Sequence, residues 1–162
     1  MQHYIECKVR YQKTMEDGTE KMVNEPYLVD ALSFTEAESR ITDEMSVYIS
    51  GEFRVDAVKK CNASEVLFSD VDDDDKWYKA KLQFITIDEK TEKEKRSNTT
   101  YLVQAKSLAR ALRYVDEFMG KTMIDYDIVG LNETKIMDVF KYEPKTEEEK
   151  KDGDKVADEY PA

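Results

Sequence analysis

Aromatic and basic side chains alternate along two short segments of the chain. Every second side chain of an extended strand lies on the same face, so each segment presents a ring and two cations on one face. These residues are Tyr4, Lys8 and Arg10 in the first segment and Trp77, Lys79 and Lys81 in the second. Nucleobases stack on such rings for about 1 to 3 kcal/mol each, while cations contact the phosphates. The pattern predicts a surface that binds single-stranded nucleic acid.

The same pattern admits a second interpretation. Glu6 interrupts the first cationic face, and the cations that follow at 90–96 are mixed with glutamates. In this interpretation Tyr4 and Trp77 cover a sheet edge or the interface between two halves of the chain. The two interpretations differ in whether the rings are exposed.

Catalytic side chains are scarce. The only histidine, His3, lies close to the start of the chain, so no serine–histidine–aspartate or cysteine–histidine arrangement with a well-held base is expected. The five glycines form no phosphate-binding loop. The acidic run 70–75 lacks the spaced ligands and the turn glycine of a calcium loop. We therefore expect a protein that is not an enzyme, with no cofactor and no metal.

The two aromatic–basic segments occupy matching places in an internal repeat. Residues 27–31 (YLVDA) recur 74 positions later as residues 101–105 (YLVQA). The segments 5–11 and 78–84 also match, as do 62–67 and 132–137. The spacing between copies changes only where loops tolerate insertions, which is typical of a duplicated unit.

Each copy predicts the order β-β-α-β-β. An alternating strand and a polar turn lead to a second strand, and a helix follows with Ser33 or Ser107 at its N-cap. Gly51 and Gly120 lie where a helix ends, and two strands follow, over 52–59 and 66–68 or over 124–129 and 136–140. We expect an α+β fold, a tandem repeat in which one helix packs on an antiparallel sheet in each unit.

Charge and composition predict four segments. The repeats cover 1–69 and 77–142, with an acidic linker at 70–76 that is too charged to pack and a disordered acidic tail at 143–162. Residues 76–141 carry 13 basic and 10 acidic side chains, in a chain whose net charge is −11. The second copy is therefore cationic. Either acidic segments fold back on this face or compete for it, or the solvated faces of the two copies have only diverged in charge.

The chain of 162 residues has no apolar stretch of membrane-spanning length and no signal pattern at its start, so we expect a cytoplasmic protein without membrane contact. Cys7 and Cys61 lack the spacing of a redox or zinc pair and are predicted to be reduced core thiols.

Three segments, 4–11, 25–38 and 136–140, resemble a family of uncharacterised proteins from gut-type bacteria and their phages. The resemblance covers nearly all of residues 1–143. It implies a recurrent standalone protein from a phage or mobile element, and it implies no activity, catalytic residue or cofactor.

The sequence thus favours a non-enzymatic binding protein. The first hypothesis is weak binding of single-stranded nucleic acid, with the acidic tail regulating access or recruiting partners. One alternative is a protein-interaction module that inhibits a host factor. Another is capture of a small nucleotide between the repeats. The oligomeric state is left open.

Overall fold

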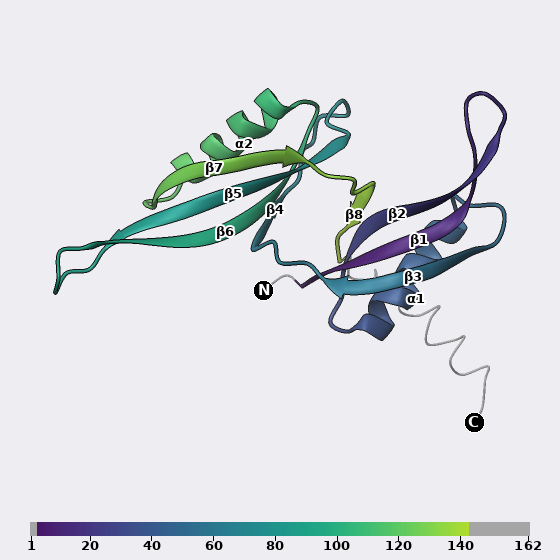
Figure 1. Ribbon diagram of the computed structural model, residues 1–162, viewed down its shortest axis with the longest axis horizontal. Coiled ribbons are helices and arrows are strands. Elements are labelled where there is room, and N and C mark those ends of the chain that lie inside the picture. Colours follow the sequence, from purple (N-terminus) through teal and green to yellow (C-terminus); the bar gives the residue numbers. More distant parts are fainter. Residues whose placement is uncertain (1–2, 143–162) are drawn as a thin grey trace, which may run out of the picture.

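The computed structural model describes residues 3–142, and the tail predicted at 143–162 lies outside the described residues. The protein has a mixed α+β fold in which the order β-β-α-β-β occurs twice (Figure 1). In chain order the elements are β1 (Tyr4–Thr14), β2 (Glu20–Asp30), α1 (Phe34–Ser46), β3 (Phe53–Lys60), β4 (Glu65–Leu67), β5 (Lys76–Ile87), β6 (Glu94–Ala105), α2 (Leu108–Gly120), β7 (Asp125–Glu133) and β8 (Asp138–Phe140).

The strands form two sheets that exchange their last strands. One sheet has the order β3-β1-β2-β8 and the other β4-β6-β5-β7. Strand β4, from the first half, pairs in parallel with β6, and β8, from the second half, pairs in parallel with β2. Each sheet therefore differs from the purely antiparallel sheet that we expected each half to complete by itself.

Each helix begins at a serine, as predicted. The Ser33 Oγ accepts a hydrogen bond from the Glu36 backbone N–H at 3.1 Å, and the Ser107 Oγ accepts one from the Arg110 backbone N–H at 3.2 Å. Such N-caps satisfy donors that have no partner within the first turn of a helix.

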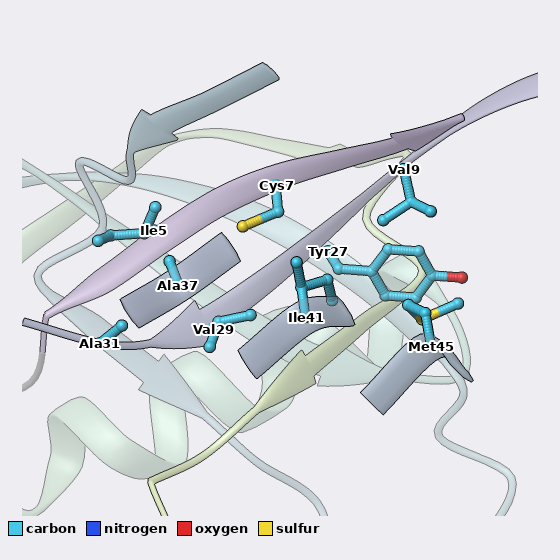
Figure 2. Packing of buried hydrophobic residues seen from close by; sticks show 9 residues of the cluster. All are labelled: Ile5, Cys7, Val9, Tyr27, Val29, Ala31, Ala37, Ile41 and Met45. Atoms are coloured by element: carbon cyan, nitrogen blue, oxygen red, sulfur yellow. The ribbon is translucent and has the colours of Figure 1, made fainter. Parts of the chain in front are cut away.

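The helices cover one face of each sheet with an apolar stripe. Figure 2 shows the first core cluster, where Ala37, Ile41 and Met45 of α1 face side chains of β1 and β2. The corresponding stripe of α2 is Ala111, Val115 and Met119, packed on β5 and β6. All six helix residues are buried, whereas Phe34, Leu108 and Leu112, which recur at the same helical spacing, are exposed.

A third cluster joins the two sheets through the faces opposite the helices. Its buried members come from both halves and are Tyr4, Leu28, Val66, Trp77, Leu102 and Val139. Val66 lies on β4 and Val139 on β8, so the exchanged strands supply part of this core. The β1–β2 and β5–β6 hairpins extend in opposite directions from the junction (Figure 1). The exchange is favoured because it buries apolar side chains between the sheets.

One residue of the predicted linker at 70–76 is buried. The Asp74 side chain is fully shielded from solvent, and its oxygens accept hydrogen bonds from the Lys106 backbone N–H at 2.7 Å and the Tyr114 hydroxyl at 2.6 Å. Arg110 Nη1 lies 3.3 Å away, and the Ser69 hydroxyl also donates to it. The prediction that this segment is too charged to pack is therefore wrong at Asp74, because these donors replace water.

No helix of the described chain is both long and apolar enough to cross a membrane. Within residues 3–142, no three His, Cys, Asp or Glu side chains are grouped so that they could hold a metal ion.

Candidate functional site

The two aromatic rings of the predicted surface are buried. Tyr4 is 5% exposed and Trp77 is 2% exposed. The Trp77 ring contacts Phe68 edge to face, with 5.4 Å between ring centroids. The prediction of exposed rings is wrong because both faces of β1 and β5 are covered at this end, one by a helix and the other by the opposite sheet. The second interpretation, an interface between the halves, describes where the rings lie.

The four predicted cations separate into different places. Lys8, Lys79 and Lys81 are exposed and Arg10 is partly exposed. Lys8 and Lys79 line one pocket between the sheets, whereas Arg10 lines a different hollow near β3. Lys81 pairs with Gly130 of β7 and does not line the pocket. Two of the six predicted site residues thus line one pocket, and Tyr4 and Trp77 lie together in the core between the sheets.

The pocket between the sheets has a volume of about 350 Å³. Its apolar wall includes Leu28 and Leu102, which belong to the core between the sheets. Five lysines surround this wall: Lys8, Lys59, Lys60, Lys79 and Lys135. A pocket of this kind, apolar with a few convergent polar groups, is the usual form of a small-molecule site.

Two crossover segments build the pocket. One, 61–63, leads from β3 to β4, and the other, 134–136, leads from β7 to β8. The Cys61 N–H donates to the Tyr4 carbonyl at 2.9 Å, and the Thr134 N–H and hydroxyl each donate to the Trp77 carbonyl at 2.8 Å. The two buried aromatic residues therefore hold the crossovers through their backbones, and strand exchange creates the pocket.

Glu6 is the one carboxylate among the residues that line the pocket. Its Oε2 lies 3.1 Å from the Lys59 Nζ, which makes an ion pair. The same oxygen is shielded from solvent. Glu6 therefore balances the charge of one of the five lysines around the pocket.

Cys61 also lines the pocket, and it is partly buried. Burial is the main cause that raises the pKa of its thiol, so the thiol stays protonated at neutral pH and is a poor nucleophile. Cys7 is fully buried in the core beneath α1, where burial raises its pKa to about 11. Both cysteines are free, and Cys7 lies in the core as predicted.

Sequence reasoning missed Lys59, Lys60 and Lys135 as site residues. Lys59 and Lys60 lie at the end of β3 and Lys135 lies in a crossover, so none is on the strand of Tyr4 or of Trp77. The matching of 62–67 with 132–137 marked both crossovers, but only the pairing of β4 and β8 with the opposite halves brings them to one pocket.

The chain belongs to the family described as a domain of unknown function (DUF4494), whose model matches residues 3–142. The resemblance to an uncharacterised family is therefore confirmed. No curated protein and no solved structure matches the chain.

Proposed function

We propose that this chain is a non-enzymatic binding protein that captures a small anionic ligand of the nucleotide class between its two sheets. The family brings no activity to the chain, so the proposal rests on the geometry of the pocket. The observation that carries the proposal is the convergence of five lysines on one apolar-walled pocket. The whole chain has a net charge of −11 at pH 7, so this local excess of cations stands out against an acidic background.

The pocket lining suits a ligand with two chemically different ends. Leu28, Leu102 and Ile136 offer an apolar wall for a flat ring, and Asn62 and Thr100 add polar groups for its edge. The surrounding lysines suit phosphate oxygens, since a lysine ammonium binds phosphate as a point charge. A volume of about 350 Å³ lies at the small end of ligand pockets, which favours a mononucleotide over a polymer.

The internal repeat is part of the proposal, because the ligand would lie between two copies of one unit. Both halves have the same order of elements, which supports the repeat. The position of a shift in strand register supports the repeat as well. This shift falls after Lys8 where β1 pairs with β3 and after Lys81 where β5 pairs with β7. Since bulges of this kind are retained within families, matching shifts favour a common origin.

Single-stranded nucleic-acid binding is less well supported than capture of a nucleotide. That hypothesis used Tyr4 and Trp77 as stacking platforms, and both rings are buried. Of the four cations of the strand face, Lys8 and Lys79 line one pocket, whereas Arg10 lines another and Lys81 lines neither. The protein-interaction alternative, a phage or mobile-element module that inhibits a host factor, stays a prediction that co-purification would test.

Binding rather than catalysis fits the groups that line the pocket. The described lining residues contain lysines, one glutamate and a thiol whose pKa burial raises, and none is a histidine. Lysine and glutamate side chains that pair with each other, as Lys59 and Glu6 do at 3.1 Å, balance charge and position a ligand.

The test is thermal denaturation in the presence of a mononucleotide at about 1 mM, or of inorganic phosphate at the same concentration. The mononucleotides are the 5′-monophosphates of adenosine, guanosine, cytidine and uridine. We expect at least one nucleotide to raise the melting temperature, because a ligand that binds only the folded state stabilises it. The double variant Lys8→Ala with Lys79→Ala should abolish the rise. The matched control is Lys95→Ala, an exposed lysine on β6 outside the pocket.

Thiol labelling of Cys61 provides an independent readout of the same pocket. Cys7 is fully buried, so reaction with a maleimide in the folded protein reports Cys61. A bound nucleotide should slow this reaction at least several-fold at saturation. The proposal fails if no nucleotide changes either the melting temperature or the labelling rate. A response to a single-stranded oligonucleotide alone would instead support the nucleic-acid hypothesis.

A further inference from the structure

A second hollow opens on the helix side of the first sheet, away from the lysine-lined pocket. Its volume is about 260 Å³, and its walls come from β1, β2, β8 and the end of α1. Figure 2 shows one wall, where the Tyr27 ring lies beside Met45 and its hydroxyl points away from the aliphatic residues of the core. The hollow therefore begins where this core ends.

Four aromatic rings line the hollow. They belong to Tyr11, Tyr27, Tyr48 and Phe140. The rings of Tyr27 and Phe140 stack with 6.0 Å between centroids and 17° between planes. Tyr48 is 74% exposed, so the hollow is open to solvent on that side. Faces of aromatic rings attract cations, and several rings around one space form the cages that recognise substituted ammonium groups.

Two carboxylates lie among the rings. Glu25 is only 7% exposed, and it accepts a hydrogen bond from the Tyr11 hydroxyl. Asp138 lines the same hollow. Burial, and to a lesser degree Glu25 and Asp138, raise the pKa of the Tyr27 hydroxyl to about 12. The hollow combines aromatic walls with negative potential.

A cation of the chain itself already uses this hollow. The Lys13 Nζ lies 3.4 Å from Glu25 Oε2, and the Lys13 side chain remains 42% exposed. The Lys13 ammonium can return to water when another cation takes its place, and Glu25 is then not left without a counter-charge.

The corresponding place in the second half lacks the carboxylate. Glu25 lies opposite Val9 on β1, and the residue opposite Leu82 at the same step of β5 is Thr99. There Tyr101 contacts Phe84 and Phe118 edge to face, at 6.3 and 5.7 Å between centroids. The second half thus has the same arrangement of strands and helix, with packed aromatic rings and no carboxylate at this place. A nearly buried glutamate at position 25 is therefore not a requirement of the fold.

We propose that the hollow around Glu25 is a binding site for a substituted ammonium group, which displaces Lys13 and lies against the rings of Tyr11, Tyr27, Tyr48 and Phe140. The site is separate from the nucleotide pocket, and its test does not depend on that function.

The experiment follows methionine methyl signals by NMR during titration with tetramethylammonium chloride, in protein labelled with ¹³C at the methionine methyl groups. Met45 and Met137 line the hollow, while Met119 occupies the corresponding helix position in the second half. We expect saturable shifts of the Met45 and Met137 signals and none of Met119. Sodium chloride controls for salt, and tert-butanol, which is neutral and of similar size, controls for apolar binding.

Two variants separate a cation site from a simple apolar hollow. Glu25→Gln should weaken binding by about tenfold, because it removes the charge from a largely desolvated site. Lys13→Ala should strengthen binding several-fold, because it removes the competing cation. Glu20→Gln is the matched control, since Glu20 is exposed on the same strand and outside this hollow. An unchanged Met119 signal shows that each variant is folded.

Any one of three results would overturn the proposal. The first is equal affinity for tert-butanol and tetramethylammonium, and the second is an equal effect of Glu25→Gln and Glu20→Gln on the affinity for tetramethylammonium. The third is the absence of a saturable shift in both the natural chain and Lys13→Ala. Titration with N-acetyl-trimethyllysine amide then identifies the source of the group. Tighter binding than tetramethylammonium indicates a side chain of a peptide, and weaker binding indicates a free amine.

Discussion

The helices of the two halves occupy matching positions, but they are anchored by different contacts. Seven residues after its N-cap, α2 carries Tyr114, whose hydroxyl donates to the buried Asp74 at 2.6 Å. At the same step α1 carries Arg40, which donates to the Asp30 carbonyl at 2.9 Å and also to the Lys141 carbonyl. The second helix is thus held by the segment that joins the halves, and the first is held in part by the chain just after β8.

This difference shows how each half depends on the other. Arg40 reaches Lys141 only because β8 has crossed to the first sheet. Asp74 fixes the start of α2 from the segment that carries the chain into β5. Neither helix is anchored by its own hairpin alone, so we expect the two halves to unfold together.

The pocket between the sheets also differs between the two halves. Glu6 lies opposite Leu28 on β2, and Lys79 lies opposite Leu102 at the same step of the second sheet. A negative and a positive group therefore occupy corresponding positions of the two halves in the pocket lining. If the halves are copies of one unit, this divergence would let the pocket distinguish the two ends of an asymmetric ligand.

Trp77→Ala should produce the largest loss of stability. Trp77 is 2% exposed and contributes to the core between the sheets, so its removal leaves a cavity that both halves share. We expect the free energy of unfolding to fall by about 3 to 5 kcal/mol. Urea denaturation followed by circular dichroism measures it, because the chain has no other tryptophan.

Lys79→Ala, two residues along the same strand and exposed, is the control and should change stability by less than about 0.5 kcal/mol. If the two halves share one core, the unfolding transition of Trp77→Ala should stay cooperative. Unfolding of one half before the other in this variant would contradict the shared core.

Asp74→Asn tests the anchor of α2 and should cost about 2 to 3 kcal/mol, because an amide cannot accept all the hydrogen bonds that the carboxylate accepts. Asp72→Asn, in the exposed part of the same segment, is the control. Hydrogen exchange of α2 amides should accelerate more than that of α1. Equal acceleration in both helices would mean that Asp74 does not anchor α2 specifically.

The same carboxylate predicts a dependence of stability on pH. Burial raises the pKa of Asp74, but the hydrogen bonds from Ser69, Tyr114, Arg110 and Lys106 outweigh it, so the pKa lies below its usual value. A group with a lowered pKa in the folded state stabilises it above the unfolded value, about 3.9, and this contribution is lost as pH falls through the folded pKa. The stability difference between the natural chain and Asp74→Asn should therefore shrink below about pH 4.

Local patterns predicted the elements well because their causes are local. The serine caps at 33 and 107 depend on spacing within one helix, and both were confirmed. The alternation along β1 and β5 placed Cys7 in the core for the same reason.

Features that depend on distant partners were missed. Three-residue strands such as β4 and β8 carry too little pattern to indicate which sheet they join. The alternation rule assumes one wet face, and it failed at Tyr4 and Trp77 because the opposite sheet covers that face. Asp74 is buried because four donors converge on it from residues up to 40 positions away. The candidate site was found in part, through Lys8 and Lys79, because those two positions face the junction.

Tyr4→Phe should have the smallest effect, with a sign opposite to that of most core changes. The Tyr4 hydroxyl is buried without a hydrogen-bond partner among the described residues, so it carries a desolvation cost. Burial, and to a lesser degree Asp30, raises its pKa to about 12, so it is neutral at ordinary pH. We expect the free energy of unfolding to rise by up to about 1 kcal/mol.

Tyr11→Phe is the matched comparison for this change, because the Tyr11 hydroxyl donates to Glu25 and its loss should cost about 1 kcal/mol. Urea denaturation at neutral pH measures both variants. A similar loss in both would show that the Tyr4 hydroxyl has a partner at the junction. Opposite signs would show that the fold tolerates an unsatisfied hydroxyl where the two halves meet, while using its counterpart on the same strand to hold a buried carboxylate.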